Sequence, residues 1–437
     1  MDTDWLGRAF LSPTAWDHLE RLVDSGPRLA GTDVERAAAE ATRDALADAG
    51  ARDARLSEFD VQGWERGTTA LNAGGTDHDC IALPRSPDGD AEGALLDLGH
   101  GLPEDFAETD CEGRVVMVSS TVPEWHPRRI HRREKYYRAV EAGATAFVFR
   151  GHLDGGLAPT GSVGTEDAPL GEIPAVGVSK EVGLRLARRH AGEEVTVAVD
   201  CETPAATSQN VRASLGPDTE ERVLVTSHVD AHDISEGAMD NGAGTAAVVG
   251  IAEALADRES DLETGVEFVC FGSEEVGLVG SERYAERVDH DSVRAVINVD
   301  GVCQGRTLRL DCNESEPLVG AAETVSERLR TPMTVTPELS THSDHWSLVQ
   351  WGVPGYHVYS DAHDGGRGWG HTRADTLDKL DRRDLRSAVI TLTDLTVEVA
   401  RADREIAHRD PADVAASLEA QGMDAGMKVT GDWPYSE

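Results

Sequence analysis

The chain has 437 residues, with 80 acidic side chains against 41 lysines and arginines and a formal net charge of −39. This charge repels nucleic acid and anionic membrane surfaces, so neither is an expected partner. Hydrophobic residues make up 39% of the chain, which is enough for a sizeable core, so the acid excess does not imply disorder. Salt at 1 M shortens the screening length to roughly 3 Å, so we expect a halophile's cytosolic protein with acids over its whole surface. A single Asp or Glu therefore carries little functional information here.

The first residues give no sign of export. The stretch "MDTDWLGRAFLSPTAWDHLERL" has no basic region followed by an apolar run. No apolar stretch in the chain approaches the roughly 20 residues needed to span a bilayer. The cysteines lack CxxC spacing, which favours reduced thiols over disulfides; they are Cys80, Cys111, Cys201, Cys270, Cys303 and Cys312. We expect a cytoplasmic protein.

The sequence of the first part of the chain predicts a helix, a strand and then a module of different composition. Residues 26–51 carry alanine and leucine at helical spacing, with Gly50 where a C-terminal cap is expected, and 54–64 alternate as an edge strand does. Residues 65–200 are richer in glycine and proline. Strands are expected in this module at 113–120, 145–151 and from 173, with helices at 131–144 and before 192. This module has no catalytic-looking cluster of its own.

From residue 221 a strand–loop–helix pattern repeats. Apolar runs at 222–227, 265–272, 293–300 and 354–360 predict strands covered on both faces, and helices are expected at 243–257, 316–330 and 381–402. We predict a three-layer α/β/α fold with a mostly parallel mixed sheet, formed by residues 1–64 and 201–410. A smaller α+β domain at 65–200 is inserted into it. A C-terminal helix or tail follows at 411–437, and its end, "GMKVTGDWPYSE", looks loose.

Polar side chains that can bind a metal ion follow each of these strands. They are His228 and Asp230 after the first strand, Asp240 in the next loop, Glu274 and Glu275, Asp300, and His371. Taken singly, each has an ordinary explanation, such as a helix cap for Asp240, a turn for Asp300 or a solvated face for the glutamate pair. Taken together, five independent positions at strand ends supply the donor types of one site, at the edge where an open α/β sheet carries its function.

Imidazole and carboxylate donors suit zinc, with cobalt or manganese as substitutes. Two such ions about 3.5–4 Å apart, bridged by one carboxylate, would hold a hydroxide and polarise a carbonyl. A neighbouring carboxylate that binds no metal would carry the proton from the water to the leaving amine. Two adjacent glutamates fit this division, with one as a ligand and one as the base.

The order and spacing of these motifs resemble the M28 family of zinc exopeptidases. The shared motifs are the His-x-Asp of "HVD", "DNGAG", "SEE", "NVDG" and "HTRADT", together with "GPRLAG" near the start and "SDHWSLVQWGVPGYHV" at 343–358. The match covers 26–64 and essentially all of 205–400. It implies a di-zinc exopeptidase whose substrate is a peptide.

The resemblance also implies a role for each position. His228 and His371 match the metal-binding histidines, Asp240 the bridging carboxylate, and Glu275 and Asp300 the terminal carboxylates. Glu274 matches the general base, and Asp230 the acid that orients the first histidine. The glycines at 242 and 244 are expected to let the chain turn tightly after Asp240. We place His232 and Asp233 at the lip of the site, away from the metals.

The oxyanion donor is not fixed by the sequence. Some relatives carry a tyrosine directly before the last histidine, where this chain has Gly370. Tyr356, Tyr359 or His345 are substitutes, and packing explains each of them equally well. Asp344 is a candidate contact for the amine of the substrate, or alternatively a member of the polar network.

The insert resembles a protease-associated (PA) domain through "GRVVMV", "AGATAFVF" and "IPAVGV". Such a module would restrict access to short or unfolded peptides, or serve as a passive decoration. The leading interpretation is an aminopeptidase, and a dipeptidase or carboxypeptidase of the same family is the alternative. A non-catalytic relative and a single-zinc glutaminyl-cyclase-like enzyme are disfavoured by the filled two-metal set. A homo-oligomer is compatible with the sequence.

Overall fold

The computed structural model describes residues 4–165, 168–361 and 368–435. The chain divides into two compact units. The first comprises Met1–Val61, Ala206–Gly370 and Ala374–Val414, and the second Gln62–Ala205, His371–Arg373 and Ala415–Glu437. Among the described residues, no helix combines the length and the apolarity that crossing a membrane requires.

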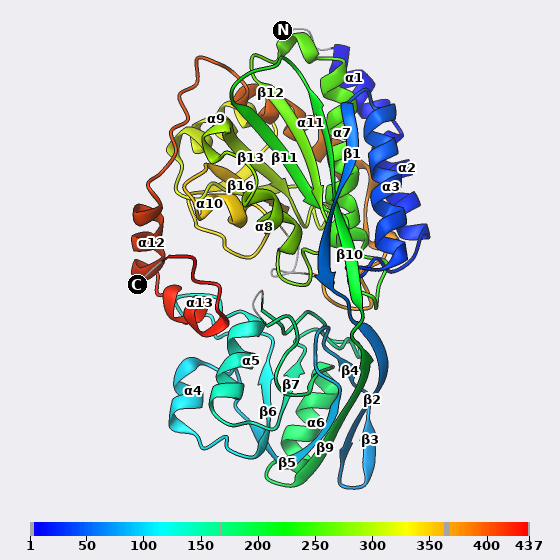
Figure 1. Ribbon diagram of the computed structural model, residues 1–437, viewed down its shortest axis with the longest axis vertical. Coiled ribbons are helices and arrows are strands. Elements are labelled where there is room, and N and C mark those ends of the chain that lie inside the picture. Colours follow the sequence, from blue (N-terminus) through cyan, green and yellow to red (C-terminus); the bar gives the residue numbers. More distant parts are fainter. Residues whose placement is uncertain (1–3, 166–167, 362–367, 436–437) are drawn as a thin grey trace. The chain divides into compact units, whose positions relative to one another are not determined.

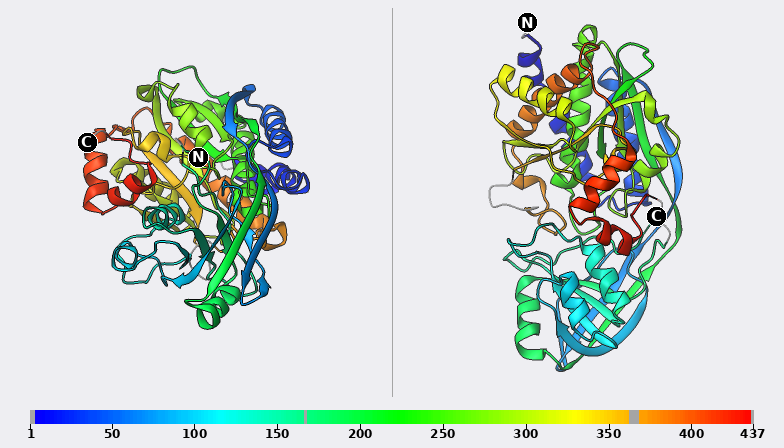
Figure 2. Two further views of the ribbon diagram at one scale, coloured as in Figure 1. Left: turned by 60° about the horizontal axis from the view of Figure 1, so that its bottom comes forward. Right: turned by 90° about the vertical axis from the view of Figure 1, so that its left-hand side faces the viewer.

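The first unit is built on an eight-stranded mixed sheet (Figure 1). In spatial order its strands are β1 (Arg52–Gln62), β10 (Ala205–Leu215), β12 (Gly265–Phe271), β11 (Arg222–His228), β13 (Val293–Val299), β16 (Gly355–Ser360), β14 (Leu308–Asp311) and β15 (Met333–Thr336). The four central strands from β12 to β16 run parallel, whereas β10 and β14 are antiparallel to their central neighbours. The long strands β1 and β10 lie side by side in every view (Figure 2).

Helices cover both faces of this sheet. The face with the larger core carries α1 (Asp4–Leu11), α2 (Thr14–Asp24), α3 (Asp33–Asp48), α7 (Ala243–Ala256), α9 (Glu316–Leu329) and α11 (Arg382–Val399). The other face carries α8 (Val279–Ala285) and α10 (Trp346–Val349). Short turns of helix are η1 (Ala238–Gly242), η2 (Glu259–Asp261), η3 (His290–Ser292) and η4 (Leu377–Lys379). Strands β11 and β12 read as nearly unbroken apolar runs because both of their faces are buried.

The second unit has its own eight-stranded sheet. In spatial order the strands are β3 (Thr76–His78), β2 (Glu65–Ala73), β9 (Glu194–Glu202), β5 (Gly89–Asp97), β6 (Arg114–Ser119), β7 (Ala146–Arg150), β8 (Ala175–Val178) and β4 (Ile81–Ala82). Its helices are α4 (Pro103–Glu108), α5 (Arg132–Glu141) and α6 (Lys180–His190). The ring of Tyr136 on α5 meets that of Phe147 on β7 edge to face at 5.5 Å. The sheet and these helices form a smaller α+β body, and the predicted fold class is confirmed.

Two local expectations are wrong. The segment at 26–51 becomes helical only at Asp33, where the Thr32 side chain accepts a hydrogen bond from the Glu35 backbone N–H and caps α3. The C-terminal segment contains two helices, α12 (Pro411–Ala420) and α13 (Asp424–Thr430), in place of a loose end. Met427 of α13 is buried, and Asp432 pairs with Arg133 at 2.7 Å. Residues 436 and 437 lie outside the described part of the chain.

Candidate metal centre

The candidate site lies where three parallel strands end. Strand β11 ends at His228, β12 is followed by Glu274 and Glu275, and β13 is followed by Asp300. Because β12, β11 and β13 are neighbours and run parallel, their carboxyl ends meet at one edge of the sheet. Polar side chains that are far apart in the sequence therefore come together there.

One group of donor atoms comprises His228, Asp240 and Asp300. Their donor atoms lie within 4.8 Å of one another. The Nε2 atom of His228 is 3.4 Å from Asp240 Oδ1 and 3.3 Å from Asp300 Oδ1. Burial disfavours the charged imidazole, but the carboxylates of Glu274 and Asp300 raise the pKa of His228 well above its usual value. One imidazole and two carboxylates at these separations fit a divalent cation.

A second group in the first unit comprises Glu275 and His232, while His371, the remaining predicted donor, belongs to the second unit. Glu275 and His232 are both buried, and His232 Nε2 lies 3.0 Å from Glu275 Oε2. The Nδ1 atom of His371 is 3.3 Å from the carbonyl oxygen of Thr160, within the second unit. In the first unit the second group therefore offers one imidazole and one carboxylate.

Asp230 holds parts of both groups in place. Its backbone carbonyl accepts a hydrogen bond from Nδ1 of His228 at 3.1 Å, which leaves Nε2 of that ring facing the carboxylates. Its carboxylate accepts from the backbone N–H groups of Glu274 at 3.0 Å and Glu275 at 3.1 Å. Asp230 is fully buried, so these bonds are shielded from water. One residue thus orients the first histidine and the glutamate pair.

Two residues outside the donor groups fix the loop that carries Asp240. The carboxylate of Asp375 accepts from the backbone N–H groups of Met239 at 2.8 Å and Asp240 at 3.0 Å. The buried guanidinium of Arg28 donates to the carbonyls of Leu22, Val229, Glu236 and Gly237 at 2.8–3.1 Å. The loop is therefore tied at both ends to segments far away in the sequence.

The glycines after Asp240 do not make the expected turn. Gly242 has helical angles, φ −57 and ψ −40, and the left-handed residue is Gly237, with φ 56. Gly244 lies so close to β13 that an added Cβ would stand 2.3 Å from the carbonyl oxygen of Val299. Gly244 serves close packing of α7 against β13, because no side chain fits between the two backbones.

Glu274 adjoins the donor groups and is not a member of either. Burial raises its pKa well above the usual value, and the nearby carboxylates of Glu275 and Asp300 add to this effect, while His228 opposes it. A carboxyl group in such surroundings accepts and releases a proton near neutral pH more readily than a solvated one.

Asp300 is held by a chain of hydrogen bonds. The Ser343 hydroxyl donates to Asp300 Oδ2 at 2.6 Å and accepts from the Asn298 amide at 2.7 Å. The amide oxygen of Asn298 in turn accepts from the Thr226 hydroxyl at 2.7 Å. The ring of His357 lies beyond, with Nε2 3.9 Å from Asp300 Oδ2. This chain fixes the direction in which the Asp300 carboxylate points.

The four candidate substrate contacts lie in different environments. Tyr356 is fully buried in the core, where its hydroxyl donates to the Leu318 carbonyl at 2.5 Å, and Tyr359 donates to Asp311 Oδ2 at 3.0 Å. Both tyrosine hydroxyls are therefore engaged away from the two donor groups. His345 is also fully buried, donates to the Ser340 carbonyl at 2.9 Å, and has its pKa lowered by burial to about 3. Asp344 is 1% exposed, and burial raises its pKa to about 8.

Four residues of the site carried no assigned role in the sequence. Arg28 and Asp375 belong to the quoted motifs "GPRLAG" and "HTRADT", so their motif membership was the available signal. His232 was expected at the lip of the site, whereas it is 3% exposed beside Glu275. His357 follows Tyr356 on β16, so it points to the opposite face of the sheet from that core residue. Asp233, also expected at the lip, is half-buried.

Residues 210–396 match the model of peptidase family M28, and residues 80–186 match that of the PA domain. The chain is a metallopeptidase whose peptidase part is similar to family M28. Its PA domain is inserted into the peptidase domain, because residues 1–61, which precede the PA match, belong to the same compact unit as the peptidase match. The fold and the site described above therefore belong to a hydrolase of peptide bonds.

Some relatives of this metallopeptidase span nearly its whole length. The chain is 25% identical to aminopeptidase YwaD of Bacillus subtilis, over 95% of this chain and 90% of the relative. Its fold is similar to that of an M28 peptidase precursor from Shewanella amazonensis, with a TM-score of 0.77 and 23% identity over 92% and 97% of the two chains. A zinc aminopeptidase from Bacillus subtilis aligns with a TM-score of 0.68 and 23% identity, over 88% and 93%.

Proposed function

We propose that this metallopeptidase is a zinc aminopeptidase that binds two metal ions and uses Glu274 as its general base. The observation that carries the proposal is the group of donor atoms from His228, Asp240 and Asp300, within 4.8 Å of one another, together with the buried pair of Glu275 and His232 in the same unit. The names of the relatives supply the direction of cleavage, because YwaD is an aminopeptidase and the aligned Bacillus enzyme is a zinc aminopeptidase.

The donor sets fit zinc. His228 and Asp300 would bind one ion, Glu275 and His371 the other, and Asp240 would bridge the two. His232 is a further candidate donor at the second ion, because its Nε2 stands 3.0 Å from Glu275 Oε2. Bound zinc lowers the pKa of water and polarises the carbonyl of the scissile bond. Cobalt and manganese accept the same donors and are expected substitutes.

The residues of the chain perform the remaining steps. Glu274 accepts a proton from the attacking water and delivers it to the nitrogen of the leaving amine. Asp230 keeps Glu274 in place through the backbone hydrogen bond at 3.0 Å. Asp375 and Arg28 keep the Asp240 loop fixed, so the donor set is organised before substrate arrives. Bound cations would also lower the pKa of Glu274, which favours its basic form.

Three matched peptides test the proposal. Purified zinc-loaded protein is incubated with a peptide that has both termini free, with its N-acetylated form and with its C-amidated form. We expect cleavage of the first and third only, with release of the N-terminal residue detected by mass spectrometry. Cleavage of the N-acetylated peptide but not of the C-amidated one would instead establish a carboxypeptidase. No cleavage of any of the three would overturn the proposed function.

A further inference from the structure

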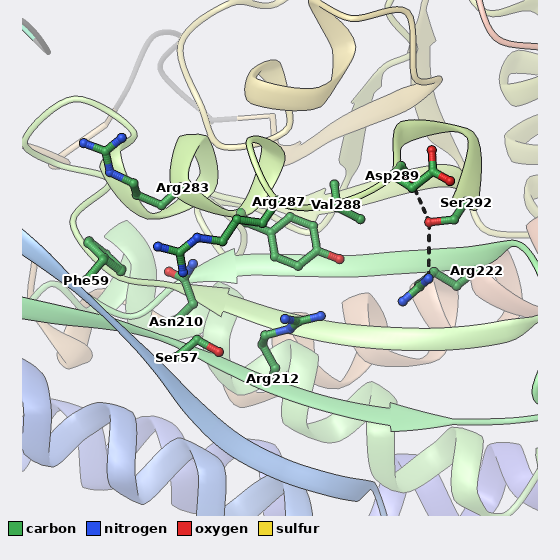
Figure 3. Close-up of a pocket in the computed structure, with 11 residues that line it drawn as sticks. Ser57, Phe59, Asn210, Arg212, Arg222, Arg283, Arg287, Val288, Asp289 and Ser292 are labelled. Carbon is green, nitrogen blue, oxygen red and sulfur yellow. Dashed lines mark hydrogen bonds between the residues drawn. The ribbon is translucent and has the colours of Figure 1, made fainter.

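A pocket of about 340 Å³ lies on the first unit, on the face of the sheet that carries α8 (Figure 3). Its walls come from strands β1, β10 and β11 on one side and from α8 and the turn after it on the other. Arginine is the most frequent residue of its lining, which consists of Ser57, Phe59, Asn210, Arg212, Arg222, Arg283, Tyr284, Arg287, Val288, Asp289 and Ser292. Four arginines in one pocket are unexpected in a chain with a net charge of −39.

The strands supply two of these arginines to the floor. Asn210 and Arg212 are two residues apart on β10, so both point to the same face of the sheet, as Ser57 and Phe59 do on β1. Arg222 begins β11, and its guanidinium donates to the Ser292 hydroxyl at 3.2 Å (Figure 3). The floor therefore combines guanidinium groups with neutral hydrogen-bonding side chains.

One buried carboxylate is shared between the two floor arginines. Glu267 is 6% exposed and accepts from Arg212 Nε at 2.7 Å and from Arg222 Nη1 at 3.4 Å. The Tyr284 hydroxyl also donates to Glu267, at 3.1 Å. A single negative charge thus faces two positive ones, and the floor keeps a net positive charge.

The rim adds a third guanidinium. Arg287 is exposed and extends from the turn after α8 toward the strand that carries Asn210 (Figure 3). Arg283 points away along the surface in the same view and pairs with Glu286 at 2.8 Å. It therefore contributes less to the positive charge of the pocket. The carboxylate of Asp289 accepts from the Asp291 backbone N–H at 3.2 Å, at the Ser292 end of the pocket. The pocket therefore has more positive than negative charges, because Arg212, Arg222 and Arg287 outnumber the carboxylates of Glu267 and Asp289.

We propose that this pocket binds a compact multivalent anion that carries phosphate or carboxylate groups. Guanidinium groups recognise both kinds of oxyanion through paired N–H donors. The hydroxyl of Ser57 adds a neutral polar group beside them, whereas the Ser292 hydroxyl already donates to the Asp289 carbonyl at 2.6 Å and the Asn210 amide to the Gly280 carbonyl at 2.7 Å. The volume of about 340 Å³ lies at the lower end of the range typical of small-molecule sites, which suits a compact ligand.

The pocket is separate from the candidate metal centre. Arg222 is the first residue of β11 and His228 the last, so the two are roughly 20 Å apart along an extended strand. The proposal therefore does not depend on the proposed aminopeptidase activity.

Calorimetric titration of the zinc-loaded protein tests this binding site. Inorganic phosphate and tricarballylate are titrated separately at one salt concentration that keeps the protein folded. We expect saturable binding of at least one probe, and the comparison between the two identifies the preferred oxyanion. The variant Arg287→Glu should raise the dissociation constant by about tenfold or more, since it replaces a charge-assisted donor with a like charge. The variant Arg383→Ala is the control, because its side chain is 76% exposed and lies outside the pocket.

Zinc content measured before and after each titration separates this site from the metal centre. Unchanged zinc with weaker binding in Arg287→Glu alone supports the proposal. The proposal is overturned if neither probe binds saturably. Equal weakening in Arg383→Ala, full affinity in Arg287→Glu, or a heat signal that follows zinc loss would each overturn it as well.

Discussion

At the scale of single residues, hydrogen bonds to backbone groups decide how the side chains of the centre are presented. The Asp230 carbonyl occupies Nδ1 of His228, and its carboxylate holds the backbone of both glutamates. An acid next to a histidine in a sequence suggests a carboxylate–imidazole contact. Here the carboxylate oxygen is 3.5 Å from Nδ1, farther than the carbonyl oxygen at 3.1 Å. The side chain of Asp230 serves mainly to position Glu274 and Glu275.

Replacing Glu274 by glutamine tests its role as a base. The amide keeps the shape of the side chain but cannot accept a proton at neutral pH, so kcat/KM should fall by about 100- to 10,000-fold. Zinc content should stay unchanged, because Glu274 belongs to neither donor group. Elemental analysis and peptide hydrolysis are measured on the same sample. Substantial turnover by this variant would reject the role.

Replacing His232 by alanine tests whether it binds the second metal. The change removes a buried imidazole 3.0 Å from Glu275, so the second cobalt ion should bind about tenfold more weakly or worse. The visible absorption of cobalt-loaded protein reports the loss of a nitrogen donor. His408→Ala serves as the control, since that ring donates to the Val293 carbonyl at 2.8 Å. Identical cobalt spectra and affinities in both variants would exclude His232 as a ligand.

Replacing Asp375 by asparagine tests the support of the Asp240 loop. An amide presents one acceptor oxygen to the two N–H groups that the carboxylate now binds, so one of them loses its partner. Zinc affinity should fall by about 10- to 100-fold with the fold intact. Asp378→Asn is the matched control, because that side chain is 73% exposed. Chelator competition gives the affinity and circular dichroism the fold.

Residue types and order were enough to select His228, Asp240, Glu275, Asp300 and His371 as a set. The sequence could not predict which neighbours face that set. His232 joins it through the path of an irregular loop, and no periodicity describes such a path. Tyr356 does not face the donor set. Alternate residues of β16 face opposite sides of the sheet, and the side chain of Tyr356 lies in the core. Predicting which residues of a strand face which side of the sheet requires the register of the strand, which the sequence alone does not give.

At the scale of elements, helix α5 shows how composition misleads. Its sequence "RREKYYRAVE" suggests a solvated face, yet Arg132, Arg133, Glu134 and Lys135 are all buried. Glu134 pairs with Arg128 at 2.7 Å and with Arg138 at 2.9 Å. The C-terminal segment pairs with the same helix through Asp432 and Arg133. Burying these charges requires partners from distant segments, which is why a local pattern predicts the helix but not its environment.

Lys135 makes the stability of the second unit depend on pH. Burial lowers its pKa from 10.5 to about 7, and its Nζ donates to the carbonyls of Ser119 and Thr121. Between pH 7 and 10.5 the unfolded chain binds the proton that the folded chain lacks. The free energy of unfolding therefore rises with pH across this window, by up to about 1.4 kcal/mol per pH unit.

The variant Lys135→Met tests this dependence. Methionine keeps much of the apolar stem and removes the titrating group, so the rise between pH 7 and 10 should disappear. Denaturant melts at several pH values measure it, and Lys180→Met is the control because that lysine is 38% exposed. The same slope in Lys135→Met as in the unaltered protein would contradict the assignment.

Elements with both faces buried were the easiest to predict from the sequence. Strands β11, β12 and β13 appear within one residue of the expected bounds, because continuous apolar runs of this length fit few other structures. Strand β10 was not recognised, since "AATSQNVRASL" mixes polar and apolar residues on a partly covered strand. This segment forms a strand because it pairs with β12, and that pairing is a tertiary contact.

At the scale of the whole molecule, the net charge of −39 opposes folding in dilute buffer. The acids near the candidate centre add to this repulsion until cations bind. Many surface ion pairs are present, such as Arg36 with Glu58 at 2.8 Å, but each pair of this kind contributes little when exposed. Screening by salt is therefore the larger stabilising effect.

The melting temperature should rise with salt. We expect a higher midpoint of thermal unfolding in about 1 M potassium chloride than in dilute buffer, because the screening length falls from about 30 Å at 0.01 M to about 3 Å. Circular dichroism on the zinc-loaded protein measures this change. A midpoint that is unchanged across this range would refute a salt-dependent fold.

The bond between Asp375 and the Asp240 loop spans 135 residues of chain, and Arg28 reaches the same loop from 209 residues away. When strands β11, β12 and β13 have been synthesised, the carboxylate that holds this loop is therefore still missing. We expect the loop to become fixed only after the segment around Asp375 has left the ribosome.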